Sequence, residues 1–98
     1  SQYREEDIVV TTGFLKKYYE FIGGLSTDNF ILYNYTKPGS REVVYNAIET
    51  HPKGWIVLDY PRGFVLSRPV PLEDFTHAGK EVRFLGWFGD AFILRWGD

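Results

Sequence analysis

The chain has 98 residues, with 44% hydrophobic and 18% aromatic residues, and its formal net charge is −2. A chain of this length can bury one core but not two, so we expect a single domain over residues 1–98. The hydrophobic content excludes an intrinsically disordered chain. The near-neutral charge excludes both a strong overall attraction for nucleic acid and an acidic mimic of DNA.

The chain contains no cysteine, which excludes disulfide bonds and thiolate chemistry. No apolar run approaches the roughly 18 residues that a membrane-spanning helix needs. Residues 1–7, SQYREED, lack the apolar core of a secretion signal. These features predict a soluble, cytoplasmic protein without a membrane partner.

The first half of the chain alternates between strand and helix patterns. Residues 7–10 are typical of a short strand. Thr12 is then placed to cap a helix that stops at Gly23, and its apolar residues recur at helical spacing: Phe14, Leu15, Tyr18, Phe21 and Ile22. Residues 30–35, FILYNY, are aromatic and β-branched and predict a strand.

A second, shorter helix is expected after this strand. Ser40 is placed to cap it, and Pro52, Lys53 and Gly54 end it; one face carries Val43, Val44, Ala47 and Ile48. Residues 55–60 and 64–67 flank Pro61-Arg62-Gly63, which is turn chemistry, and predict a hairpin.

The remaining residues predict a loop and a final hairpin. Residues 69–79 have the composition of a connecting loop, whereas 82–87 and 91–96 flank the turn sequence FGD. The order β-α-β-α-β-β-β-β indicates an α+β fold, with two helices packed on a mainly antiparallel sheet.

The chemistry-bearing residues form no recognised catalytic or metal-binding pattern. His51 and His77 lack the spacing of metal ligands. No nucleophile lies in a glycine-flanked elbow, and no glycine-rich phosphate loop is present. We therefore expect no metal and no cofactor.

One long-range sequence pattern is more specific than these scattered residues. It consists of Tyr33-Asn34, Lys53-Gly54 followed by WIVLD, and Arg68-Pro69. In order and spacing it resembles the amino-terminal part of the adenylating nucleotidyltransferase domain of bacteriophage-type ATP-dependent RNA ligases. The resemblance covers roughly residues 14–98, and it implies that the final hairpin occupies the place of the family's nucleotide-attachment motif.

The chain departs from this family at the residues that carry its chemistry. Lys53 stands where the family has an arginine, Leu72 stands where it has a lysine, and Trp87 stands where it has the attachment lysine. An indole cannot form the phosphoramidate with AMP, which needs an amine nucleophile. We therefore expect that the protein is not an enzyme.

Our leading hypothesis is a non-catalytic protein that binds another protein, in its specific form a small phage-encoded inhibitor of a nucleic-acid enzyme. The phage source comes from the ligase resemblance. The abundance of Trp and Tyr favours an interface, since these residues often anchor interfaces. The segment 84–96 is either a core hairpin alone, or a hairpin that also presents a protein-binding surface of Trp87, Phe88 and Asp90. The two descriptions are compatible, because successive residues of a strand face opposite sides of the sheet: some aromatic side chains can be buried while others are exposed.

The alternative is a nucleic-acid or nucleotide-binding module that retains part of a ligase-like cleft. Its phosphate contacts would come from Lys53, Arg62, Arg68 and Arg95, and its stacking platform would be Tyr33 or Trp87. The near-neutral charge counts against it, because phosphate contacts supply most non-specific affinity. The two hypotheses differ in whether the basic residues converge on one face.

Overall fold

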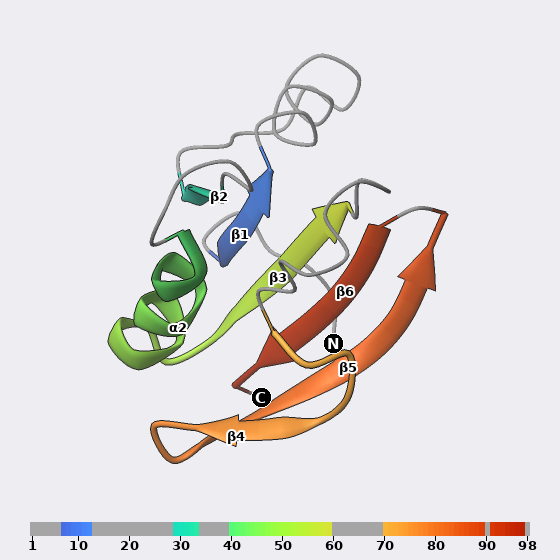
Figure 1. Cartoon of the computed structure of the whole chain (residues 1–98). Coiled ribbons are helices and arrows are strands. Elements are labelled where there is room, and N and C mark those ends of the chain that lie inside the picture. Colours follow the sequence, from blue (N-terminus) through green and yellow to red (C-terminus); the bar gives the residue numbers. More distant parts are fainter. Residues whose placement is uncertain (1–6, 13–28, 34–39, 60–69, 90, 98) are drawn as a thin grey trace.

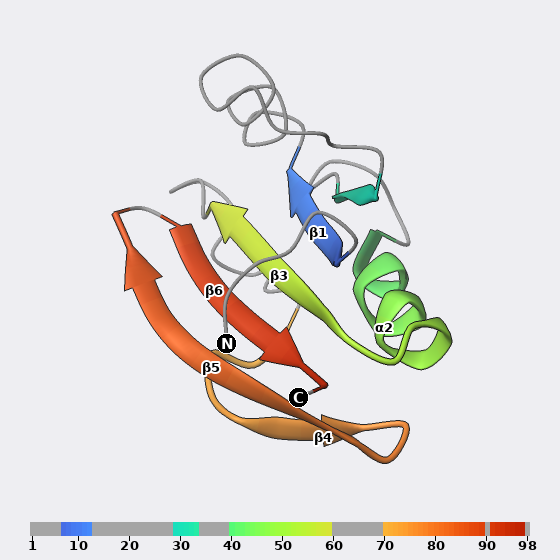
Figure 2. The ribbon, with the colours of Figure 1, turned by 180° about the vertical axis from the view of Figure 1, so that it is seen from behind.

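A computed structural model describes residues 7–12, 29–33, 40–59, 70–89 and 91–97 (Figure 1). These residues form one helix and a six-stranded sheet with the strand order β2-β1-β3-β6-β5-β4. The elements are β1 (Ile8–Thr12), β2 (Phe30–Tyr33), α2 (Ser40–Thr50), β3 (Gly54–Asp59), β4 (Phe75–His77), β5 (Lys80–Phe88) and β6 (Ala91–Trp96). Both views show α2 beside the β1–β3 half of the sheet and the β4–β5 hairpin at the other edge (Figures 1 and 2).

The predicted fold class, two helices on a mainly antiparallel sheet, is wrong. The described residues contain one helix, and the sheet is mixed: β2, β1 and β3 run parallel, whereas β3, β6, β5 and β4 pair antiparallel. The parallel half arises because α2 carries the chain from β2 across to β3, with β1 between them. Parallel strands require such a crossover connection. The helix expected after Thr12 lies outside the described residues, and Thr12 itself is the last residue of β1.

The other predicted elements have mixed outcomes. The second predicted helix is confirmed as α2, whose first residue is Ser40, and the final hairpin is confirmed as β5 and β6. Residues 69–79 were expected to form a loop, but they contain β4, whose three residues pair with the start of β5. The predicted partner of β3, residues 64–67, lies outside the described residues. Among the described strands, β3 is flanked by β1 and β6.

The core lies between α2 and one side of the sheet, which we call the helix face. Alternate residues of the central strands point into it and are fully buried: Val10, Ile56, Leu58, Phe92, Leu94 and Trp96. From α2, Val44, Ala47 and Ile48 pack against them, as their helical spacing predicted. Val43, which was predicted on the same face, is outside this core cluster and lines a pocket on the outer side of α2. At eleven residues α2 is too short to cross a membrane, and it is the one helix in the part of the chain described.

The other side of the sheet, which we call the opposite face, carries the residues in between. Val9, Trp55, Arg95 and Arg83 lie in one row across β1, β3, β6 and β5, because each is the register partner of the next. Since strand residues alternate faces, all four side chains belong to this face. The row mixes apolar and basic side chains, unlike the apolar helix face.

Candidate functional site

The far end of β5 presents two large apolar side chains. Leu85 and Trp87 are 52% and 53% exposed, respectively, whereas a typical buried core residue of the sheet is fully covered. We call these two residues the Trp87 surface. Single exposed apolar residues are common, whereas contiguous exposed apolar area marks binding sites, so these two residues, two positions apart on one strand, are candidates for a binding surface.

The ring of Trp87 rests on the core although half of its surface is exposed. Trp87 is the register partner of Phe92 on β6, and the two rings meet edge to face with centroids 5.6 Å apart. Phe92 is fully buried, so it provides a fixed support for the indole. A partner that binds Trp87 therefore loses little side-chain entropy in ordering it, which is the property of an interface anchor.

A β-bulge brings Leu85 to this surface. The register of β5 against β6 shifts between Phe84 and Gly86. Leu85 is therefore an extra residue in β5 that has no register partner on β6. Gly86 has a φ of 112°, a conformation that side-chain-bearing residues rarely adopt, and an added Cβ there would meet open space. Glycine is thus required by the backbone conformation and not by close packing.

Among the described strands, only β4 lies along the outer edge of β5, and it covers only the beginning of that edge. β5 has nine residues, but β4 pairs with Lys80–Val82 alone, and just beyond it the Phe84 N–H donates to Asp74 Oδ1 at 2.8 Å. Along residues 85–88 no strand among those described lies on the outer edge. Exposed backbone at an edge can pair with an extended segment of another chain.

The structure describes the side-chain position of only one of the three predicted protein-binding residues. Trp87 lies on the helix-face side of β5, at the end remote from α2. Phe88 is the last residue of β5, and its side chain is outside the described part. Asp90 is also outside the described residues; Gly89, which precedes it, is a turn residue directly after β5.

The described residues of the nucleic-acid alternative do not all lie at one site. Tyr33 ends β2 on the helix face and is 4% exposed, so its ring cannot stack on a base. Lys53 and Arg95 both lie around Trp55 on the opposite face of the sheet. Arg62 and Arg68 are outside the described residues.

A polar cluster that the sequence did not reveal holds Trp55 in place. The Trp55 indole Nε1 donates to Asp7 Oδ2 at 3.1 Å, and Lys53 Nζ lies 3.9 Å from Asp7 Oδ1. The Arg95 guanidinium carbon lies 4.7 Å from the centre of the Trp55 ring, in a cation–π contact. Asp7 and Arg95 are 4% and 6% exposed, so the cluster is largely covered.

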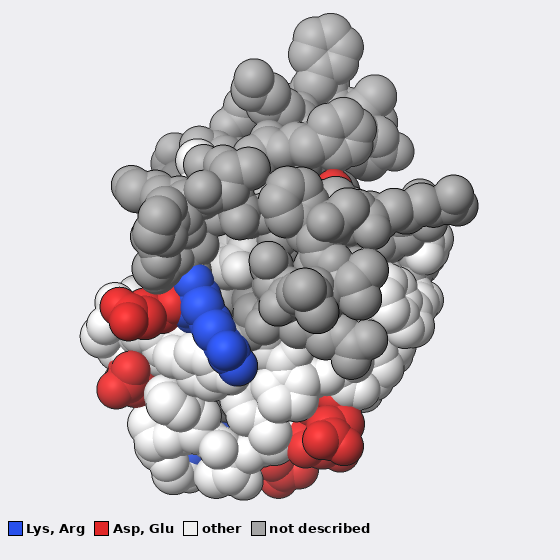
Figure 3. Space-filling view, in the orientation of Figure 1, with Lys and Arg blue, Asp and Glu red and all other residues white. Residues whose placement is uncertain are grey.

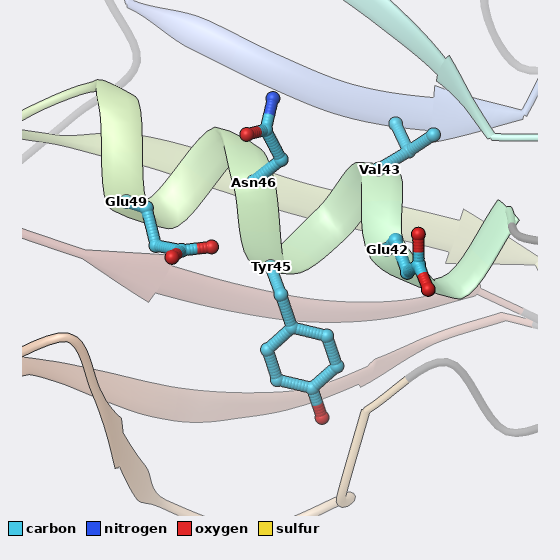
Figure 4. A pocket seen from close by; sticks show the side chains of 5 residues that line it. All are labelled: Glu42, Val43, Tyr45, Asn46 and Glu49. Atoms are coloured by element: carbon cyan, nitrogen blue, oxygen red, sulfur yellow. The ribbon is translucent and has the colours of Figure 1, made fainter.

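The outer side of α2 carries a shallow acidic pocket. Its described lining is Glu42, Val43, Tyr45, Asn46 and Glu49 (Figure 4). Tyr45 extends from the helix toward the β4–β5 hairpin, where its ring meets that of His77 edge to face at 4.7 Å. His77 Nε2 in turn lies 3.6 Å from Glu49 Oε2. Acidic side chains lie over α2 in the space-filling view, with a basic side chain directly beside them (Figure 3).

Within the described residues, no group of three His, Asp or Glu side chains could hold a metal ion. No protein-family model, curated protein or solved structure matches this chain. The proposed function therefore depends on the geometry of the described surfaces.

Proposed function

We propose that this protein is a non-catalytic binding protein that engages another protein through the Trp87 surface. The observation that carries the proposal is the state of Trp87: it is 53% exposed, yet its ring is supported edge to face by the buried Phe92. Tryptophan is one of the residue types enriched at the energetic hot spots of protein interfaces. Leu85 beside it extends the apolar contact area.

The strand edge next to Trp87 supports the same proposal. A partner segment that runs along residues 85–88 would hydrogen-bond to the backbone while its side chains contact Leu85 and Trp87. In strand addition, backbone pairing gives affinity and side-chain contacts give specificity. The register bulge at Leu85 also restricts which partners fit, because it twists the edge away from a flat ladder.

The nucleic-acid alternative has less support as the main function. The ring of Tyr33 is buried, the α2 side is acidic, and the formal net charge is −2. Inhibition of a nucleic-acid enzyme and a cytoplasmic location stay predictions from the sequence.

The test is a comparative capture experiment. Wild-type protein and the variants Trp87→Ala, Leu85→Ala and Leu32→Ala are immobilised, and proteins retained from a lysate of the native source are quantified. Leu32 is the matched control, because it is 51% exposed but lies on β2 at the other edge of the sheet. We expect one defined protein to be retained by wild type and Leu32→Ala. Its affinity should fall by about 2 kcal/mol for Trp87→Ala and less for Leu85→Ala.

Thermal melts of the same variants separate binding from folding. Because Trp87 is half exposed, its truncation should lower the free energy of unfolding far less than the roughly 3 to 5 kcal/mol typical of a buried tryptophan. Equal retention of the same protein by wild type and Trp87→Ala would exclude the Trp87 surface as the binding site.

A further inference from the structure

The free part of the outer edge of β5 begins beside an exposed acidic residue. Among the described strands, β4 pairs with β5 only as far as Val82, and just beyond it the Phe84 N–H donates a hydrogen bond to Asp74 Oδ1 at 2.8 Å. This bond shows that the backbone of Phe84 points to the outer edge. Asp74 and its neighbour Glu73 are both exposed. The end of the free edge nearest to β4 is therefore acidic.

The free edge itself carries no charge. Residues 84–89, FLGWFG, contain no acidic or basic side chain, and no described strand pairs with residues 85–88 on the outer side. Natural proteins usually protect an unpaired edge with charged residues, because exposed backbone groups pair with other strands. An uncharged edge that has the exposed side chains of Leu85 and Trp87 beside it suits an extended, apolar segment.

The position of β4 indicates the direction in which such a segment runs. β4 is antiparallel to β5, and Asp74 directly precedes its first residue, Phe75. A segment that lies along residues 85–88 in the same direction as β4 ends its paired stretch beside Asp74. Antiparallel pairing is also slightly more stable per residue than parallel pairing. The carboxyl-terminal end of the bound segment thus meets the two acidic residues.

The charges favour a different protein over a second copy of this chain. A second copy that pairs through the same stretch offers the uncharged residues 84–89 to Glu73 and Asp74. A lysine or arginine of another chain forms an ion pair there, and the Asp74 carboxylate can accept further hydrogen bonds besides the one from Phe84. The space-filling view shows acidic side chains over the part of the molecule where β4 and β5 lie, apart from those over α2 (Figure 3).

We propose that the partner contributes an extended segment that pairs antiparallel with residues 85–88 and carries a lysine or arginine at its carboxyl-terminal end. The segment occupies the Trp87 surface, so this proposal rests on the proposed function. Its apolar side chains contact Leu85 and Trp87, and its basic side chain contacts Asp74 and Glu73. Backbone pairing supplies affinity, and the basic residue fixes direction and register.

The test is a titration of the ¹⁵N-labelled protein with three capped hexapeptides at constant ionic strength. The first is Thr-Val-Thr-Val-Thr-Lys, the second has the lysine at the amino-terminal end instead, and the third has glutamate in place of the carboxyl-terminal lysine. The backbone amide signals of residues 85–88 and the indole signal of Trp87 are followed. We expect saturable shifts, with the first peptide binding about threefold more tightly than the second and about tenfold more tightly than the third, as exposed ion pairs are weak.

Asp74→Asn makes the test specific, because asparagine keeps an acceptor for the Phe84 N–H but loses the charge. This variant should lose most of the preference for the carboxyl-terminal lysine. Glu81→Gln removes the same charge from the part of β5 that pairs with β4, away from the free edge, and should leave the preference unchanged. An equal loss of preference in both variants would overturn the proposed role of Asp74.

The possible results distinguish a failure of this proposal from a failure of the proposed function. Equal affinities of the three peptides, with shifts at residues 85–88, would refute the basic partner and leave the Trp87 surface as a site for extended segments. Binding that shifts no signal of residues 85–88, or no binding of any peptide, would refute strand pairing at this edge. The loss of capture by Trp87→Ala would then still support the proposed function, and equal capture would refute it.

Discussion

The ammonium group of Lys80 donates a hydrogen bond to the backbone carbonyl oxygen of Ile48 at 2.5 Å, across a sequence separation of 32 residues. The same group also donates to the carbonyl oxygens of Glu49 and His51, at 3.2 and 2.9 Å. The last carbonyl groups of a helix lack partners within it and carry partial negative charge. Lys80 therefore caps α2 from the start of β5 and ties the helix to the sheet.

Replacing Lys80 by Met should lower the free energy of unfolding by about 2 kcal/mol, since it removes a charge from the helix end and leaves carbonyl groups poorly satisfied. Urea denaturation measures this change. The neighbouring exposed Glu81 serves as the control, and Glu81→Gln should change stability by less than about 0.5 kcal/mol. Similar stabilities of wild type and Lys80→Met would show that α2 does not depend on this cap.

Gly54 cannot be replaced without moving the core. A Cβ at this position would lie 2.3 Å from the Trp96 ring and 2.8 Å from the Ile8 carbonyl oxygen. Trp96 is fully buried, and its Nε1 donates to the His51 carbonyl oxygen at 2.9 Å, so the indole has little freedom to shift. Gly54→Ala should therefore destabilise the protein by about 3 kcal/mol or more.

Gly79→Ala provides the comparison for Gly54→Ala. Gly79 has a φ of 74°, and nothing lies within 4 Å of an added Cβ, so only backbone strain opposes the substitution. Its expected cost is about 1 kcal/mol. Thermal melts of both variants measure the two stability losses. A smaller loss for Gly54→Ala than for Gly79→Ala would show that the contact with Trp96 relaxes easily.

The turn between β4 and β5 contains a residue in an unfavourable conformation. Ala78 and Gly79 connect the paired residues His77 and Lys80, and both have positive φ, 52° and 74°. A two-residue hairpin turn of this kind favours Asn followed by Gly. Ala78→Asn should thus stabilise the protein by about 0.5 to 1 kcal/mol, measured by chemical denaturation. A loss of stability would mean that the exposed Ala78 side chain makes a contact that outweighs the strain.

The absence of nucleotidyl transfer is a separate prediction. The resemblance to RNA ligases noted in the sequence aligns Trp87 with their attachment lysine. This alignment stays a prediction, and an indole cannot carry AMP. Incubation with radiolabelled ATP and a divalent metal should therefore leave the protein unlabelled. Trp87→Lys tests whether the nucleophile alone is missing, and we expect this variant to remain unlabelled too. An acid-labile AMP adduct on any lysine of the wild type would contradict the non-catalytic function.

Local sequence patterns predicted the elements whose partners are near in the chain. The helical spacing of Val44, Ala47 and Ile48 placed α2, because one apolar face must be buried wherever the helix packs. The FGD turn placed the β5–β6 hairpin, because a short turn forces its flanking strands to pair. The aromatic residues of this hairpin were expected in the core, and Phe92 and Trp96 are fully buried.

These local patterns could not predict which strands pair when the strands are far apart in the sequence. The predicted hairpin partner of β3, residues 64–67, lies outside the described residues. The described neighbours of β3, which are β1 and β6, were not predicted, because hydrophobic alternation specifies a strand and not its neighbour. β4 was missed because FTH is short and weakly apolar, and its pairing with β5 supplies the hydrogen bonds that its composition does not indicate.

By itself, the sequence determined the buried hairpin, the helix and the lack of a recognised catalytic motif, since each depends on residue type and local spacing. Only the tertiary structure decided that Trp87 is exposed on a buried support, that Tyr33 is covered, and that Arg83 lies opposite Arg95. These facts depend on the register between strands. A bulge of one residue at Leu85 exchanges the two faces of β5, so Trp87 points to one side of the sheet and Arg83 to the other.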